Sequence, residues 1–442
     1  MDRRVATTTF IGCFAGAALA WLFRPSLYAP YDEGMAYVAV AHLNFAPAAG
    51  YYASRVLHPL TARMIAQLFH VPIDAHVFLV LSVVSLIVFF TCLGAYYGME
   101  LGPSPSLWLL LAVTAPVVDS YRNYYWQDLF YAALCAVFFL ALRANWWSSL
   151  PFILLLFVTR ESVVVLVAAM VLVTAMRRRW KYCFSAIAVG LIGMSIKSRL
   201  VAHALPNEHG IPVGMLDALK IPYNFLLNIC GLEFWTNTIA QFAEPPEWVR
   251  NLPPWVHLGN IHQVGFSGFH WDRPVRTLVV MAAGFGLLPL IMSMAAKRER
   301  IRSLVQRTDL ATACVYGVLM FILVPLQGTA PARYVLYAWP VFWIFGVAEL
   351  EVAIPDLRRR AAIVVLSVCA AWTPAVVRLV MTRSVPQGPD SFSDVSDAGL
   401  LISLAVLAVI YAVGWRLVSL WMSQQASRGW LLQKTDSAQN AS

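Results

Sequence analysis

The chain has 442 residues, of which 60% are hydrophobic and only 12% are charged. This composition excludes a water-soluble globular protein. The long apolar runs indicate a multi-pass membrane protein made of helices, because backbone polar groups in lipid are satisfied only in helices and closed barrels. The formal net charge of +9 does not indicate nucleic-acid binding, since the basic residues gather at the ends of apolar runs and so report membrane topology. Seven cysteines, mostly within these runs, predict neither a disulfide framework nor a metal site.

The apolar runs predict an all-α, polytopic transmembrane bundle of about 11–13 helices. In chain order the expected segments are 5–23, 73–96, 105–118, 128–143, 150–176, 182–200, 275–295, 309–326, 333–351, 361–380 and 398–421. The first segment also has features of a signal peptide, with a cleavage-like sequence at 18–20, but we favour an uncleaved helix.

The segment 150–176 decides the topology. As one crossing, it would place the basic clusters 177–181, 297–307 and 358–360 outside, against the positive-inside rule. As a hairpin of two half-helices with its apex at 159–161, it leaves all three clusters in the cytoplasm. We therefore predict a hairpin and about twelve crossings, with half-helices that are buried in protein or line a wet cavity.

Two long loops are expected on the outer, non-cytoplasmic face. The loop 24–72 contains an amphipathic stretch at 53–70, which predicts a helix lying on the membrane surface. The loop 201–274 is rich in Pro, Trp and His, and we expect it to fold over the outer opening. We expect residues 1–380 to form one transmembrane module, and residues 381–442 to form the last transmembrane helix and a cytoplasmic tail.

Several basic residues lie at the outer boundary, against the usual charge bias. Arg160 and Arg333 each lie between apolar runs, and Arg55 and Lys197 lie nearby in the predicted topology. Guanidinium and ammonium groups beside apolar helices would suit a membrane-embedded phosphate. The alternative is that these side chains snorkel or form ion pairs.

Acidic residues supply a candidate base. Asp32 and Glu33 follow the first apolar segment, and a carboxylate near neutral walls would have a raised proton affinity and could accept a proton from an attacking hydroxyl or amine. The pair could also simply cap the next helix. Asp119 and Asp128 flank a link rich in aromatic residues, including Tyr124, where they could orient a sugar, bind an ion or cap a helix.

Four short patterns, in this order, resemble the GT-C superfamily of polyprenyl-phosphate-dependent glycosyltransferases, which includes protein O-mannosyltransferases and aminoarabinose transferases. Residues 31–37 (YDEGMAY) are similar to the acidic motif of the family's first loop, and residues 55–60 (RVLHPL) to its second surface helix. Residues 159–161 (TRE) resemble a Thr-Lys turn, with Arg replacing Lys. Residues 333–340 (RYVLYAWP) resemble the start of a later Arg-Tyr helix.

The resemblance implies that the module 1–380 has a GT-C-like fold and transfers a sugar, with inversion, from a polyprenyl-phosphate donor to a glycan, lipid or protein acceptor. The roles it suggests are catalytic for Asp32 and Glu33, donor-phosphate binding for Arg55, Arg160, Lys197, Arg333 and Tyr334, and acceptor or sugar binding for His58, Asp119, Tyr124, Asp128 and Glu161. No metal ligand is assigned, and a divalent cation, Mg²⁺ or Mn²⁺, is left open as a cofactor. The expected location is a bacterial inner membrane, with the site facing the periplasm or exterior.

Other functions remain open at this point. Broken helices and charges at membrane depth are also found in secondary transporters, although the C-terminal half has no second copy of either the Asp-Glu loop or the Thr-Arg-Glu turn. A lipid-linked polysaccharide polymerase or ligase would use similar donors but rely mainly on outer Arg and His residues. A non-catalytic assembly subunit would tolerate replacement of Asp32.

Overall fold

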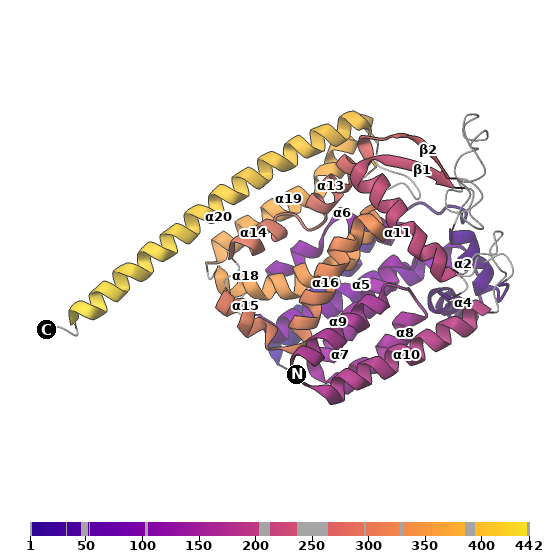
Figure 1. Cartoon of the computed structure of the whole chain (residues 1–442), viewed down its shortest axis with the longest axis horizontal. Coiled ribbons are helices and arrows are strands. Elements are labelled where there is room, and N and C mark those ends of the chain that lie inside the picture. Colours follow the sequence, from indigo (N-terminus) through magenta and orange to yellow (C-terminus); the bar gives the residue numbers. More distant parts are fainter. Residues whose placement is uncertain are drawn as a thin grey trace.

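The computed structural model of the chain is a bundle of helices with a small antiparallel strand pair at one end (Figure 1). It describes residues 2–31, 33–45, 52, 54–101, 105–202, 213–236, 264–295, 298–327, 331–354, 356–384 and 394–439. The elements up to residue 202 are α1 (Arg3–Leu22), α2 (Glu33–Ala41), α4 (Leu57–Phe69), α5 (Ala75–Glu100), the 3₁₀ helix η1 (Pro105–Ala112), α6 (Ala115–Arg122), α7 (Asp128–Ala144), α8 (Trp146–Phe157), α9 (Val163–Met176) and α10 (Trp180–Ala202).

The remaining elements, from residue 213 onward, include the two strands. They are α11 (Val213–Cys230), β1 (Leu232–Thr236), β2 (Val264–Phe269), α13 (Asp272–Gly284), α14 (Leu288–Ala295), α15 (Arg298–Val305), α16 (Thr308–Gln327), α17 (Pro331–Val335), the 3₁₀ turn η3 (Leu336–Ala338), the π-helix η4 (Pro340–Gly346), α18 (Val347–Ala353), α19 (Leu357–Thr382) and α20 (Asp397–Gln439). The strands pair with Leu232 opposite Phe269 and Thr236 opposite Val264.

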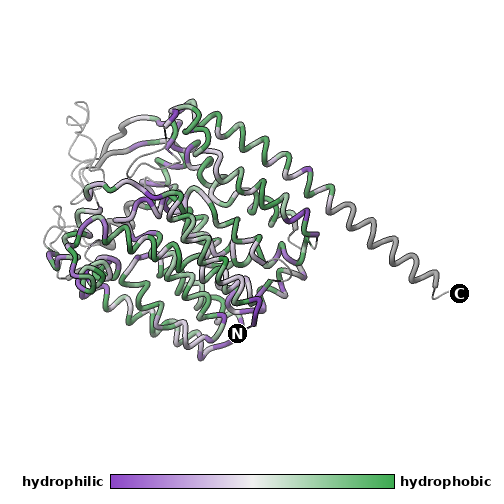
Figure 2. The backbone as a smooth tube through the Cα atoms, turned by 180° about the vertical axis from the view of Figure 1, so that it is seen from behind, coloured by the Kyte–Doolittle hydropathy of each residue, from purple (hydrophilic) through white to green (hydrophobic). Residues whose placement is uncertain are grey.

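Seven helical segments among the described residues are long and apolar enough to cross a membrane, or eight if the pair α13 and α14, bent by 70°, forms one span. Hydrophobic residues run along the helices, and hydrophilic residues gather toward their ends (Figure 2). These features confirm a helical, multi-pass membrane protein. The further predicted crossings fall on α7 and on shorter helices, among them α8 and α9.

The predicted hairpin within 150–176 is confirmed as a break between two helices. α8 ends at Phe157 and α9 begins at Val163, so the apex 159–161 lies between them. The single helix predicted at 105–118 is wrong, because η1 ends at Ala112 and α6 starts after Thr114. Pro116 in the first turn of α6 is well suited to a helix start but not to a helix interior, so it favours the break.

The two predicted outer loops contain regular structure. α4 lies inside the predicted stretch 53–70 and leaves Met64 and Leu68 exposed, while His58 and Ala62 on its other side are buried. Within 201–274 the chain forms α11 and the two strands, so this region is more than a loop. Asn224 and Asn228 on α11 donate to backbone carbonyls at the end of α16, which fixes α11 to the bundle.

Helices α1 and α5 approach each other closely through glycines. A Cβ placed on Gly12 would lie 2.3 Å from the carbonyl oxygen of Phe90, and a Cβ on Gly94 would lie 2.4 Å from that of Thr8. Small residues let membrane helices pack backbone to backbone, which brings dispersion contacts that lipid tails would otherwise supply. This packing joins the N-terminal helix to the longest apolar helix of the N-terminal half.

We predict that Gly94→Ala destabilises this packing. The added methyl group would meet the backbone of α1, which cannot rotate away, and overpacking of this kind costs roughly 1–3 kcal/mol. Thermal unfolding of the purified protein in detergent would measure the loss. Gly268→Ala is the control, because its Cβ would meet only His270 Nε2, at 3.6 Å. Equal unfolding temperatures for the two variants would contradict the prediction.

An ionic cluster lies where α5 and α7 end and α16 begins. Glu100 accepts hydrogen bonds from Arg143 and Arg307, and Arg307 also donates to Asp309 at 2.6 Å. Tyr96 donates to the same Asp309 carboxylate at 2.7 Å. The cluster therefore links α5, α7 and α16 at one end of the bundle.

The basic segments lie at this same end of the bundle. Arg177 and Arg179 both donate to the hydroxyl of Thr308, the first residue of α16. Arg360 donates to Glu351, which also accepts from Trp108 on η1, the element that follows α5. The described residues of the three basic segments, 177–181, 298–307 and 358–360, thus share one end, as the hairpin requires. In Figure 1, α15 and the N-terminus lie toward this end, and α2 and α4 lie away from it.

Candidate functional site: a buried arginine and carboxylate network

A second ionic network occupies the opposite end of the bundle, where α2 and α7 begin. Asp128 is the first residue of α7, and its side chain has no exposed area. It accepts hydrogen bonds from Arg160, from Tyr337 and from Arg333 Nε, the last at 2.6 Å. A carboxylate at a helix N-terminus also interacts favourably with the helix dipole. Asp128 is therefore the centre of the network.

Arg333 extends the network to α2. Its two terminal nitrogens donate to the two carboxylate oxygens of Glu33, both at 2.9 Å. The guanidinium also lies 3.9 Å from the ring centroid of Trp126, close enough for a cation–π contact. Pro331 starts α17 two residues earlier, a position that proline favours because its missing N–H is not needed there. Arg333 is thus held on several sides at once.

Arg55 forms the third part of the network. It donates to both carboxylate oxygens of Glu161, with Nη2 to Oε2 at 2.9 Å, and to the hydroxyl of Tyr37 at 3.0 Å. Lys197 on α10 lies 3.3 Å from Glu161. Gln127, with its amide oriented to satisfy its neighbours, accepts from both Arg55 and Arg160 and so bridges the two halves of the network.

Aromatic rings cover the arginines. Arg160 lies 5.3 Å from the ring centroid of Tyr334 and 4.8 Å from that of Tyr337. Arg55 lies 5.6 Å from the ring of Tyr52. Such contacts stabilise a desolvated cation by about 2 kcal/mol or more. The rings and carboxylates together explain how three arginines tolerate burial.

The charges around Glu33 contradict the proton affinity that the sequence predicted for it. Burial opposes ionisation of Glu33, but the charge and hydrogen bonds of Arg333, with the charges of Arg55 and Arg160, outweigh it and hold the pKa of Glu33 below its ordinary value. Glu161 has a lowered pKa because Arg55 and Lys197 likewise outweigh its burial. The predicted raised proton affinity of the acidic pair is therefore wrong for Glu33, which is a weak base in this arrangement. Asp32 lies outside the described residues.

The structure brings together most of the predicted site residues. The network contains Glu33, Arg55, Asp128, Arg160, Glu161, Lys197, Arg333 and, through its ring, Tyr334. His58 is buried among the rings of Tyr37, Phe78 and Phe130, and burial lowers its pKa to about 3 despite the charge of Asp128, so the imidazole is neutral.

Two predicted sugar-binding residues lie beside the network. The ring of Tyr124 packs on Tyr28 with centroids 4.6 Å apart, and its hydroxyl accepts from the Tyr28 backbone N–H, so it anchors the segment before α2. Asp119 is buried on α6, where its backbone carbonyl accepts from the side chain of Asn123.

The members of the network that were not predicted include Tyr37, Trp126, Gln127 and Tyr337. Tyr37 and Tyr337 each lie four residues, one helical turn, after a predicted ionic residue, namely Glu33 and Arg333. That spacing could have identified both. Trp126 carries no such signal, because its partner Arg333 is more than 200 residues away in the sequence.

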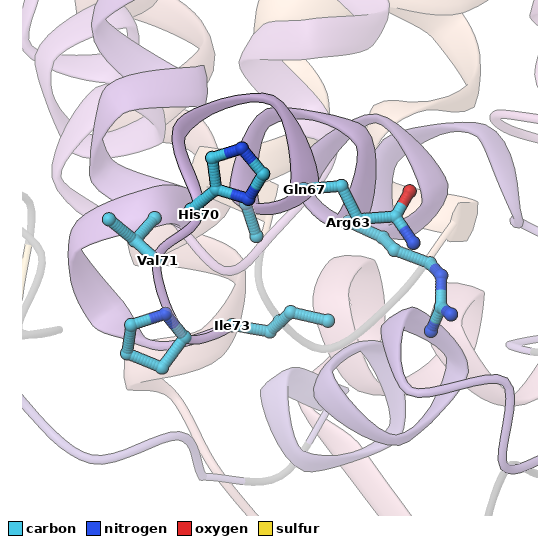
Figure 3. Close-up of a pocket in the computed structure, with 7 residues that line it drawn as sticks. Arg63, Gln67, His70, Val71 and Ile73 are labelled. Carbon is cyan, nitrogen blue, oxygen red and sulfur yellow. The ribbon is translucent and has the colours of Figure 1, made fainter.

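A separate open pocket lies at the end of α4. It has a volume of about 520 Å³ and is lined by residues that include Arg63, Gln67 and His70 (Figure 3). Arg63 also donates to the backbone carbonyl of Ala41 at the end of α2. Within the described part of the chain, no group of three or more His, Cys, Asp or Glu residues could hold a metal ion.

The fold and the network define a multi-pass helical membrane protein with a buried ionic site at one end of its bundle. Comparison with protein-family models, with curated proteins and with solved structures finds no match for the chain.

Proposed function

We propose that the chain is a membrane glycosyltransferase that moves a sugar from a polyprenyl-phosphate donor to a glycan, lipid or protein acceptor. One observation carries the proposal: three arginines with side chains at most 11% exposed, Arg55, Arg160 and Arg333, meet in one network at the end of a bundle of apolar helices. A polyprenyl chain requires apolar helices, and its phosphate requires guanidinium groups close to them. A lipid with a phosphate headgroup requires both in one place.

The arrangement of charges along the bundle supports an orientation. The end opposite the network carries the basic segments 177–181, 298–307 and 358–360. Positively charged segments favour the cytoplasmic side. We therefore propose that the network faces the periplasm or exterior of a bacterial inner membrane, where lipid-linked sugars with flipped headgroups would be available. In this proposal residues 1–380 form the catalytic module, with a GT-C-like fold.

In the proposed reaction, an acceptor hydroxyl or amine attacks the anomeric carbon of the donor sugar. The bond from that carbon to the phosphate oxygen breaks, the electron pair leaves with the phosphate, and the anomeric configuration inverts. Asp32 takes the proton of the attacking group, and Arg160 and Arg333 stabilise the charge that develops on the phosphate. Asp128 and Glu161 hold the arginines in place, which is a positioning role rather than the sugar contact that the sequence suggested.

The most direct test of the proposal is mass analysis of glycolipids and glycans from cells with and without the protein. A glycosyltransferase removes one glycan or glycolipid species on deletion and restores it on complementation. Unchanged glycans and glycolipids, in cells shown to make the protein, would contradict the function.

We predict that Arg333→Lys weakens binding of undecaprenyl phosphate, the expected leaving group, by about ten- to a hundredfold. Lysine keeps the positive charge but loses the two-pronged contact, and a hydrogen bond to a charged group contributes roughly 1.5–3 kcal/mol. Native mass spectrometry of the protein in nanodiscs would measure the affinity. Arg276→Lys is the control, since Arg276 pairs with the exposed Asp394 rather than with the network. An unchanged affinity in Arg333→Lys would contradict its role.

A further inference from the structure

The contacts of Arg333 divide into two groups. Its Nε donates to Asp128, and the face of its guanidinium lies over the ring of Trp126. Its two terminal nitrogens, by contrast, donate to Glu33, with one bond to each carboxylate oxygen. If Glu33 moved away, Asp128 and Trp126 would still fix the orientation of the guanidinium.

Glu33 is also the more accessible partner. Its side chain is 14% exposed and that of Arg333 is 11% exposed, whereas Asp128 is completely covered and Arg160 is 4% exposed. Glu33 is the first residue of α2, so its side chain projects from a helix end rather than from a packed helix face. Of the two carboxylates that bind Arg333, Glu33 is therefore the one that a ligand could reach.

A second cation lies near Glu33. Arg55 Nη1 lies 3.8 Å from Glu33 Oε2, near enough for ion pairing but too far for a hydrogen bond. A small rotation of the carboxylate would exchange its bonds with Arg333 for a closer ion pair with Arg55, whose Nη1 keeps its hydrogen bonds to Tyr37 and Gln127. Its charge would remain compensated during the exchange, which avoids the large cost of an isolated buried ion.

We propose that the Glu33 carboxylate occupies an exchangeable anion site on Arg333, and that a phosphate group displaces it. Carboxylate and phosphate present two oxygens to the guanidinium in the same two-pronged geometry, so one can replace the other without moving the arginine. The inference rests on the proposed function, which supplies the phosphate of a lipid-linked sugar as the ligand. Between turnovers, Glu33 compensates the charge of Arg333 and holds its side chain in place. When the phosphate binds, the Glu33 carboxylate moves toward Arg55.

The test measures the affinity for undecaprenyl phosphate in nanodiscs and, separately, for inorganic phosphate. Glu33→Gln removes the competing charge, so we expect binding at least ten times tighter than in the wild type. Glu161→Gln is the matched control, because it removes one charge from the same network without touching Arg333. If the tighter binding arose only from the lower negative charge of the network, both variants would gain affinity equally. That result would overturn the exchange.

A second variant guards against misfolding of Glu33→Gln. Glu33→Asp keeps the charge but withdraws the carboxylate from Arg333, and we expect an affinity between those of the wild type and Glu33→Gln. If Glu33→Gln binds only undecaprenyl phosphate more tightly, the site recognises the phosphate together with its lipid chain. If it binds inorganic phosphate more tightly as well, the site recognises the phosphate group itself. Both results support the proposal. If the wild type binds the lipid and neither variant binds it more tightly, the exchange is overturned while the proposed function stands. No binding to any protein overturns both.

Discussion

Replacing Asp128 with alanine should destabilise the protein by about 3–5 kcal/mol, the cost typical of removing one partner from a buried ion pair. Asp128 is fully covered and accepts from Arg160, Arg333 and Tyr337, so its removal leaves three donors without this acceptor. Without it, Arg160 loses its ion-pair partner in a site without solvent. Thermal unfolding in detergent should therefore begin at a much lower temperature in Asp128→Ala.

A matched control separates burial from the simple loss of an ion pair. Asp394 pairs with Arg276, but its side chain is 63% exposed, and exposed pairs of this kind contribute less than about 1 kcal/mol. Asp394→Ala should therefore unfold close to the wild type. The double variant Asp128→Leu with Arg160→Met should recover part of the loss, because it no longer leaves a buried cation unpaired. Similar unfolding of Asp128→Ala and Asp394→Ala would show that the network is not a structural centre.

The sequence predicted the arginines of the network better than their partners. Arg160 and Arg333 could be identified because a charge between apolar runs is costly unless it is paired or functional. The hairpin could be predicted because the basic clusters constrain the topology as a whole, and the break between α8 and α9 confirms it. These inferences use only the position of a residue relative to apolar segments.

The partners of the arginines depend on contacts between distant parts of the chain. Glu33 and Arg333 are 300 residues apart, and Asp128 and Arg333 are 205 residues apart. No local pattern reports such pairs, so the sequence left open whether Asp128 orients a sugar, binds an ion or caps a helix. The same contacts reverse the expected proton affinity of Glu33, because a neighbouring guanidinium outweighs burial. By contrast, the error at 105–118 had a local signal in Pro116.

The second large effect is a loss of sugar transfer when Asp32, the acid next to Glu33, is replaced. Glu33 is engaged by Arg333 and has a lowered pKa, so the base in the proposed reaction is Asp32. Its two neighbours in the chain both lie at the network: Glu33 on Arg333, and Tyr31 with its ring 6.1 Å from that of Trp126. Asparagine has nearly the same size as aspartate but cannot accept the proton. We therefore expect Asp32→Asn to reduce sugar transfer by about 10²- to 10⁴-fold, the usual contribution of a general base.

The readout must distinguish chemistry from folding and binding. Asp32→Asn should insert into the membrane, unfold and bind undecaprenyl phosphate like the wild type, while complementation of the missing glycan or glycolipid fails. Asp74→Asn is the control for the same chemical change, because Asp74 caps the start of α5 outside the network and asparagine caps equally well. A fully active Asp32→Asn would remove the base from the mechanism. A tag beside residue 33 that reports from the cytosol would remove the orientation as well, since the donor phosphate and the base must meet on the same side of the membrane.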